Sequence, residues 1–215
     1  MKNLKTVVQV LLIVGSLIIA YQIYATILNP IDFKTQQDLR YSVTIESLKN
    51  IRKAETAFKD ANGRFTASWD SLAIFIKKGT LPLVKKIGSL SEEQLEAGMT
   101  EKEAIKKGLI IRDTIRVAIM DSLFGKSYNP ERMRFIPYTK DEVFSIGTNV
   151  ITTGSGVQVA VLEVKAHNNQ ILSELMDKFK QEVINLNEKR RLDGKYPGLK
   201  IGSLTETNNS AGNWE

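Results

Sequence analysis

The sequence predicts an α+β fold: an N-terminal transmembrane helix continues into a long amphipathic helix, which packs on an antiparallel sheet of four or five strands. Three observations lead to this prediction. An uncharged apolar run lies near the N-terminus, a helical pattern of apolar residues follows it, and short segments of alternating polarity come after Gly108. We expect the sheet to bury one face against the long helix.

The apolar run from Val7 to Leu28 contains no Asp, Glu, Lys, Arg or His. As a helix it would be roughly 33 Å long, which is enough for a hydrocarbon core of about 30 Å. Tyr21 and Tyr24 lie toward its C-terminal end, and amphipathic rings favour the membrane interface. The sequence therefore predicts a single membrane-spanning helix whose partner is the lipid bilayer.

A cleaved signal peptide is the alternative interpretation of this run. It fits less well, because apolar cores of signal peptides have about 7–15 residues and because Ile23 and Tyr24 are large residues ahead of the only plausible cleavage point, Ala25. Cleavage would release a periplasmic or surface binding module. For an uncleaved anchor, the short basic head of residues 1–6 should stay in the cytoplasm and the body should lie in the periplasm, outside a bacterial inner membrane.

A second helical segment is expected over residues 29–61. Its apolar residues recur at spacings of three and four, and Pro30 should kink or break the helix where it leaves the membrane. Asn62-Gly63 should end it. Its apolar stripe must be buried on the chain's own body, which is the default, or on another copy; the stripe consists of Tyr41, Ile45, Leu48, Ile51 and Phe58.

Residues 62–203 are predicted to form an α+β extracytoplasmic domain, followed by a flexible tail at 204–215. Helix-capping signals accompany helices at Trp69–Lys78, after Ser89 or Ser91, and after Thr100. A loop or short extended segment is expected at 81–90. The predicted strands lie within residues 112–123, 134–138, 143–146, 150–153 and 157–164, with a hairpin turn at Gly154–Gly156, and a last helix spans Asn169–Arg191.

Composition excludes several kinds of chemistry. The chain has 215 residues, one His and no Cys, so disulfides, iron–sulfur clusters, Cys-ligated zinc and a Cys nucleophile are excluded. The net charge of +6 is spread along the chain without a long block of like charges, so no nucleic-acid partner is predicted.

The candidate catalytic residues are weak. His167 is interpreted as a turn residue, since one His completes neither a triad nor a metal site without a supporting signature. Gly125-Lys126-Ser127 is similar to the end of a phosphate-binding loop, but Met120 stands where the first Gly is required. We therefore identify no catalytic residue, cofactor, metal or small-molecule substrate, and we expect a protein that is not an enzyme.

Residues 51–72 resemble the end of the N-terminal helix of type IV pilins and type II secretion pseudopilins. The matching motif consists of Ala54, Phe58, Asn62, Gly63 and Phe65. The chain lacks the leader and the acid within the apolar run that accompany prepilin cleavage. The rest of the chain is similar to uncharacterised single-pass membrane proteins of Bacteroidota. The resemblance implies a pilin-like fold and a membrane-held structural subunit of an envelope, pilus or secretion apparatus, which assembles with membrane proteins or with itself.

Overall fold

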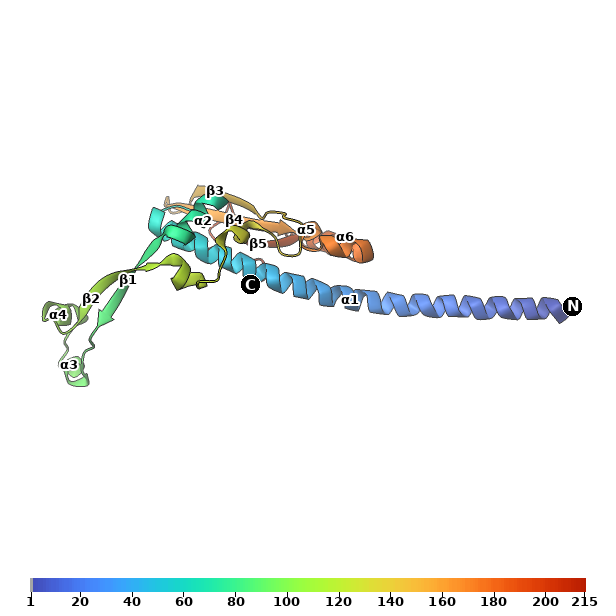
Figure 1. Ribbon diagram of the computed structural model, residues 1–215, viewed down its shortest axis with the longest axis horizontal. Helices are drawn as coiled ribbons and strands as arrows, with labels where there is room; N and C mark the ends of the chain where they lie inside the picture. The colour runs from blue at the N-terminus through green and yellow to red at the C-terminus, as the bar shows by residue number, and fades with distance from the viewer. Residues whose placement is uncertain (1) are drawn as a thin grey trace. The chain divides into compact units, whose positions relative to one another are not determined.

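The computed structural model describes residues 2–215 and has an α+β fold (Figure 1). The chain divides into two compact units. One consists of Met1–Lys49 and Arg134–Glu215, and the other of Asn50–Met133. Helix α1, Lys2–Asn62, contributes residues to both units.

Helix α1 continues through Pro30, so of the two expected outcomes, a kink or a break, the break is wrong. A proline in a helix removes one hydrogen bond and costs about 3 kcal/mol. Packing begins three residues later, where Phe33 is buried and its ring lies 5.7 Å from that of Phe179. We infer that this packing, together with the helical turns on both sides, outweighs the cost of one proline.

The C-terminal end of α1 lies where the sequence predicts it. The Gly63 amide donates to the Lys59 carbonyl at 2.7 Å, and the Asn62 side-chain amide donates to the Phe58 carbonyl at 2.9 Å. Gly63 has a φ of +73°, in the left-handed region that favours glycine. The chain can therefore leave the helix sharply at this point.

The first unit holds a three-stranded antiparallel sheet in the order β3-β4-β5. Strands β3 (Ser145–Thr152) and β4 (Gln158–His167) form the predicted hairpin, and β5 (Gly198–Gly202) pairs with the end of β4. One face of the sheet is apolar and buried through Leu162, Val164, Ala166, Leu199 and Ile201. The single helix expected at Asn169–Arg191 is divided into α5 (Asn168–Ile171), a 3₁₀ turn and α6 (Met176–Leu192), since Leu172 leaves the helical conformation.

The second unit contains α2 (Trp69–Lys78) and a long hairpin made of β1 (Thr80–Ile87) and β2 (Ile111–Ala118). The two strands pair antiparallel from Thr80↔Ala118 to Ile87↔Ile111. Two short helices with capping boxes, α3 (Glu92–Glu96) and α4 (Glu101–Lys106), connect them. A π-helix, η1 (Met120–Phe124), and a 3₁₀ helix, η2 (Pro130–Arg134), follow β2.

The strands therefore form two sheets, of two and three strands, rather than the single sheet of four or five that the sequence predicts. The segment expected to be a loop or short extended structure at 81–90 is mostly strand β1. Its partner is β2, whereas β3, β4 and β5 form a separate sheet, to which Gly212 adds an isolated bridge at Ile201. Local alternation of polarity predicts a strand but does not identify its neighbour, which explains the difference.

The last residues of the chain, predicted to be a flexible tail, are hydrogen bonded along β5. The Gly202 amide donates to the Ala211 carbonyl at 2.9 Å, and the Asn213 amide donates to the Lys200 carbonyl at 3.0 Å. The Asn213 side chain accepts from the Lys200 amide at 3.1 Å and donates to the Gly198 carbonyl at 3.0 Å. The tail therefore covers the edge of β5 that β4 leaves open.

Replacing Gly63 by Ala should destabilise the protein by about 1 kcal/mol, since an L-residue is strained at positive φ. The measurement is the free energy of unfolding of the full chain in detergent micelles. Gly154→Ala is the matched control, because neither position has an atom within 4 Å of the added Cβ and Gly154 lacks the positive φ. Equal effects of the two substitutions would contradict this account of the helix end.

Candidate functional surfaces

The predicted membrane segment is exposed along α1. It is one helix, long and apolar enough by length and composition to cross a membrane, and none of the apolar window is buried. Tyr21 and Tyr24 at its C-terminal end are exposed by 72% and 64%. Val7 is exposed as well, and Leu28 is partly covered. A surface of this size and composition is costly in water.

The predicted stripe farther along α1 is covered within the chain. Tyr41, Leu48 and Ile51 are buried, and Ile45 and Phe58 are half-buried. Arg40, Thr44 and Gln37 on the same helix are also buried. The stripe thus belongs to the core of the single chain, which is the default of the two alternatives that the sequence leaves open.

A chain of buried polar side chains ties the stripe to the helices after β4. The Tyr41 hydroxyl donates to the Asn168 side-chain oxygen in a short hydrogen bond. The Asn168 amide group donates to Asn187 at 2.9 Å, and Asn187 donates to Asn169 at 2.8 Å. Burial raises the pKa of Tyr41, so the hydroxyl keeps its proton and remains a donor. Each of these side chains has a hydrogen-bond partner in the next one, as buried polar groups require.

An ion pair lies one residue before Tyr41. The Arg40 guanidinium donates to the Glu174 carboxylate at 2.9 Å and stacks over the Tyr138 ring, 4.8 Å from its centroid. The Arg40 side chain is nearly buried, whereas that of Glu174 is exposed. This ion pair and the polar side chains described above fix α1 against the rest of the first unit. Arg40 and Asn168 were not identified as important from the sequence.

The pilin-like motif surrounds the end of α1 in the second unit. Ala54 is fully buried, and the Phe58 ring meets the Phe75 ring edge to face at 5.0 Å. Phe65 lies below the Lys59 ammonium, 4.9 Å from the ring centroid. Asn62 and Gly63 form the helix end described above. These residues therefore terminate the helix and hold the loop after it.

Glu55 is the buried acid of this region. Its side chain is 0% exposed, and its Oε2 accepts from the Thr66 amide at 3.1 Å. Its Oε1 has no hydrogen-bond partner among the described residues. Burial raises the pKa of Glu55 from 4.5 to about 7, against the opposing effect of the Thr66 hydrogen bond. The sequence indicates this burial through the position of Glu55, which follows Leu48 by seven residues and Ile51 by four and so lies on the apolar face of the helix.

His167 acts as a capping residue. Its Nδ1 accepts from the Asn169 amide at 3.1 Å at the start of α5. Burial, with a contribution from the Arg191 charge, lowers its pKa. In the described part of the chain no group of three or more His, Asp or Glu side chains is placed to hold a metal ion.

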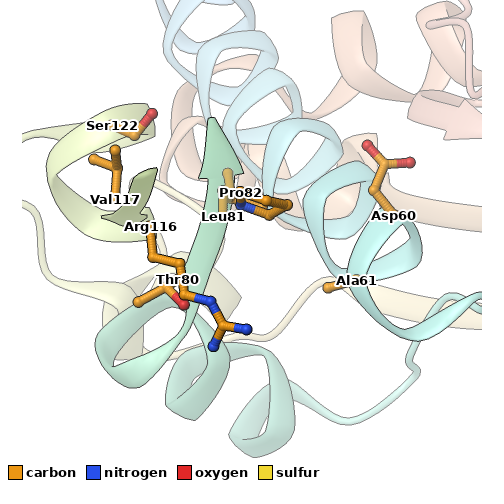
Figure 2. Close-up of a pocket in the computed structure, with 8 residues that line it drawn as sticks. All are labelled: Asp60, Ala61, Thr80, Leu81, Pro82, Arg116, Val117 and Ser122. Carbon is orange, nitrogen blue, oxygen red and sulfur yellow. The ribbon is translucent and has the colours of Figure 1, made fainter. Parts of the chain in front are cut away.

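The hairpin of β1 and β2, with α3 and α4 at its end, is called the arm from here on, and α3 with its flanking turns is the tip. A groove of about 580 Å³ lies at its base (Figure 2). Thr80, Leu81 and Pro82 of β1 form one side of it. Its other lining residues are Arg116 and Val117 of β2, Ser122 of η1, and Asp60 and Ala61 at the end of α1.

Polar and apolar groups meet in this groove. The Arg116 guanidinium extends away from β2 into the space below Pro82, whereas the Asp60 carboxylate on α1 points away from it (Figure 2). Arg116 has no hydrogen bond or ion pair with any described residue. The groove can therefore accept an acidic group and an apolar side chain together.

Comparisons with protein-family models, with curated proteins and with solved structures found no match.

Changing Tyr41 to Phe should destabilise the protein by about 1–3 kcal/mol, because the buried Asn168 oxygen loses its donor. Tyr138→Phe is the control, since Tyr138 is exposed and its ring, rather than its hydroxyl, contacts Arg40. Unfolding free energies of the two variants should differ by more than 1 kcal/mol; a difference near zero would show that the polar chain contributes nothing.

Glu55 should make the stability depend on pH. Its folded pKa is raised to about 7, so the neutral carboxyl contributes stability that is complete below pH 4.5 and is lost as the pH rises through about 7. The loss is roughly 3 kcal/mol. Glu55→Gln, which still accepts from Thr66, should abolish this dependence, whereas the exposed Glu188→Gln should retain it. Denaturation series between pH 4 and pH 8 would measure it; identical profiles for all three proteins would refute the assignment.

Proposed function

We propose that this protein is a single-pass protein of a bacterial inner membrane and works as a non-enzymatic structural or assembly component. The observation that carries the proposal is the division of α1. Its first part presents bare apolar side chains over the length of a bilayer, and the next part is the central helix of the folded body. A helix of this kind would tie the folded part of the chain to the lipid.

The proposed topology places residues 1–6 in the cytoplasm and the body in the periplasm. Lys2 and Lys5 precede the span, and basic residues favour the cytoplasmic side. The exposed tyrosines mark the opposite interface. The partners we propose are the bilayer and other membrane proteins or further copies of this chain.

The resemblance of residues 51–72 to pilins and pseudopilins supports the assembly role. In this chain the motif ends a long N-terminal helix that is followed by antiparallel strands. We propose on this basis that the protein belongs to an envelope, pilus or secretion apparatus. We propose that α1 is kept whole and anchors each subunit.

The alternative is a binding module released after Ala25. The length of the apolar run, residues 7–28, favours the anchor, because it exceeds the apolar core of about 7–15 residues in signal peptides. Intact mass and N-terminal sequencing of the protein from native membranes separate the two. A chain starting at Met1 supports the anchor, and a chain starting near Thr26 would replace it by the released module.

Placing a charge in the centre of the span should detach the protein from the membrane. Leu17→Arg adds about 3 kcal/mol to the cost of insertion, so the fraction resisting alkaline extraction should fall. Leu192→Arg is the control, since Leu192 is exposed by 87% but lies in α6, outside the span. Full retention of Leu17→Arg in the membrane would argue against a spanning helix.

A further inference from the structure

The arm exposes apolar side chains, as a surface that binds a partner does. A two-stranded hairpin is marginally stable alone in water, and in the described chain β1 and β2 pack chiefly on each other. Ile87 and Ile111, which face each other across the strands, are exposed by 48% and 56%. At the tip, Leu95 of α3 is exposed by 58%. These side chains project from the arm without cover.

We propose that the tip of the arm of one copy docks in the groove at the base of the arm of a second copy. Leu95 lies against the apolar wall formed by Leu81, Pro82 and Val117. The acidic residues beside Leu95 pair with Arg116. This contact deepens the assembly role proposed above and rests on it.

Charge complementarity identifies the occupant of the groove. The tip, residues 88–98, contains Glu92, Glu93 and Glu96 and no Lys or Arg. The base of the second unit, residues 50–80 and 116–133, contains nine Lys and Arg against five Asp and Glu, an excess of four positive charges. The free guanidinium of Arg116 lies inside the groove at this basic end. Opposite charges at the two ends of one arm favour contact between the tip of one copy and the base of another.

The geometry of the arm requires the second copy. The base pair Thr80↔Ala118 and the distal pair Ile87↔Ile111 are the first and last of eight consecutive residue pairs, so seven residue steps separate them. At about 3.4 Å per residue the tip lies roughly 25 Å from its own groove. An arm that is paired along its whole length cannot fold back on itself. The tip must therefore reach the groove of a neighbour.

The contact would be heterologous, because two different surfaces meet. Each pair of copies leaves one tip and one groove free, so the same contact can be repeated. Copies would then associate into open chains rather than closed pairs. The β4–β5 side of the first unit plays no part in this contact.

The natural chain contains no Cys, which makes site-directed crosslinking direct. Two differently tagged full-length copies, one with Ala97→Cys beside the tip and one with Ser122→Cys in the groove wall, are expressed together in membranes. Both positions are exposed, and Leu95 is kept. A short thiol-specific crosslinker should join the two tags, whereas neither variant alone should crosslink. A chain carrying both cysteines should give a ladder of oligomers.

Two further substitutions test the chemistry of the contact. Leu95→Ser should lower the yield of mixed crosslinks at least tenfold, because the apolar side chain is lost. Arg116→Glu should lower it about two- to fivefold, and Glu92→Arg on the other copy should restore it. Lys140→Glu is the matched control, since Lys140 is an exposed cation of the first unit.

The outcomes are separable from those for the membrane proposal. Labelling with a maleimide establishes that both cysteines are accessible, and alkaline extraction establishes membrane insertion. Absence of mixed crosslinks from accessible cysteines in an inserted protein would overturn the contact but leave the anchor intact. Crosslinking of Ala97→Cys with itself would indicate a tip-to-tip contact and would also overturn the proposal. The proposal would also be overturned if Leu95→Ser and Arg116→Glu left the yield of mixed crosslinks unchanged.

Discussion

Everything in this structure depends on one helix that meets two different surroundings. Along α1 the apolar residues first cover the whole circumference and are exposed, and they then narrow to one buried face. The change occurs around Phe33, the first buried residue after the apolar run. A helix that is apolar all round requires lipid or protein, whereas a one-sided helix requires a core. Because the backbone is continuous, the position of the folded body is coupled to the position of the anchor.

The body is attached to this helix by specific polar contacts as well as by apolar burial. Apolar packing alone tolerates sliding along a smooth helix face, since it is not directional. The hydrogen bond from Tyr41 to Asn168 and the ion pair of Arg40 with Glu174 permit a single register. In the second unit, Glu55 and Thr66 perform the same task for the loop after the helix. Both sets of contacts place a polar group in the core, which costs free energy. We infer that they contribute a single packing register rather than net stability.

The parts predicted correctly from the sequence are those whose signals are local. The capping boxes at Ser91 and Thr100, the ending of α1 at Gly63 and the hairpin around Gly154–Gly156 each depend on a few neighbouring residues. Pro30, the partner of β1 and the docking of Asn213 depend on residues far away in sequence, so local patterns could not decide them. The same holds for the candidate surfaces. The apolar run of α1 can be recognised from composition, whereas the position of the Arg116 guanidinium in the groove becomes evident only when β1 and β2 are paired.

In the proposed assembly, the anchor and the arm would reinforce each other energetically. A contact made by one leucine and a few exposed ion pairs is weak between molecules that are free in solution, because association costs translational and rotational freedom. Copies held in one membrane, as proposed, would already have lost much of that freedom and would be present at a high effective concentration. A weak and repeated contact is then sufficient for assembly, and it remains reversible when the local density of copies falls. An apolar surface larger than that at Leu95 would bind more tightly, but it would also risk aggregation before insertion.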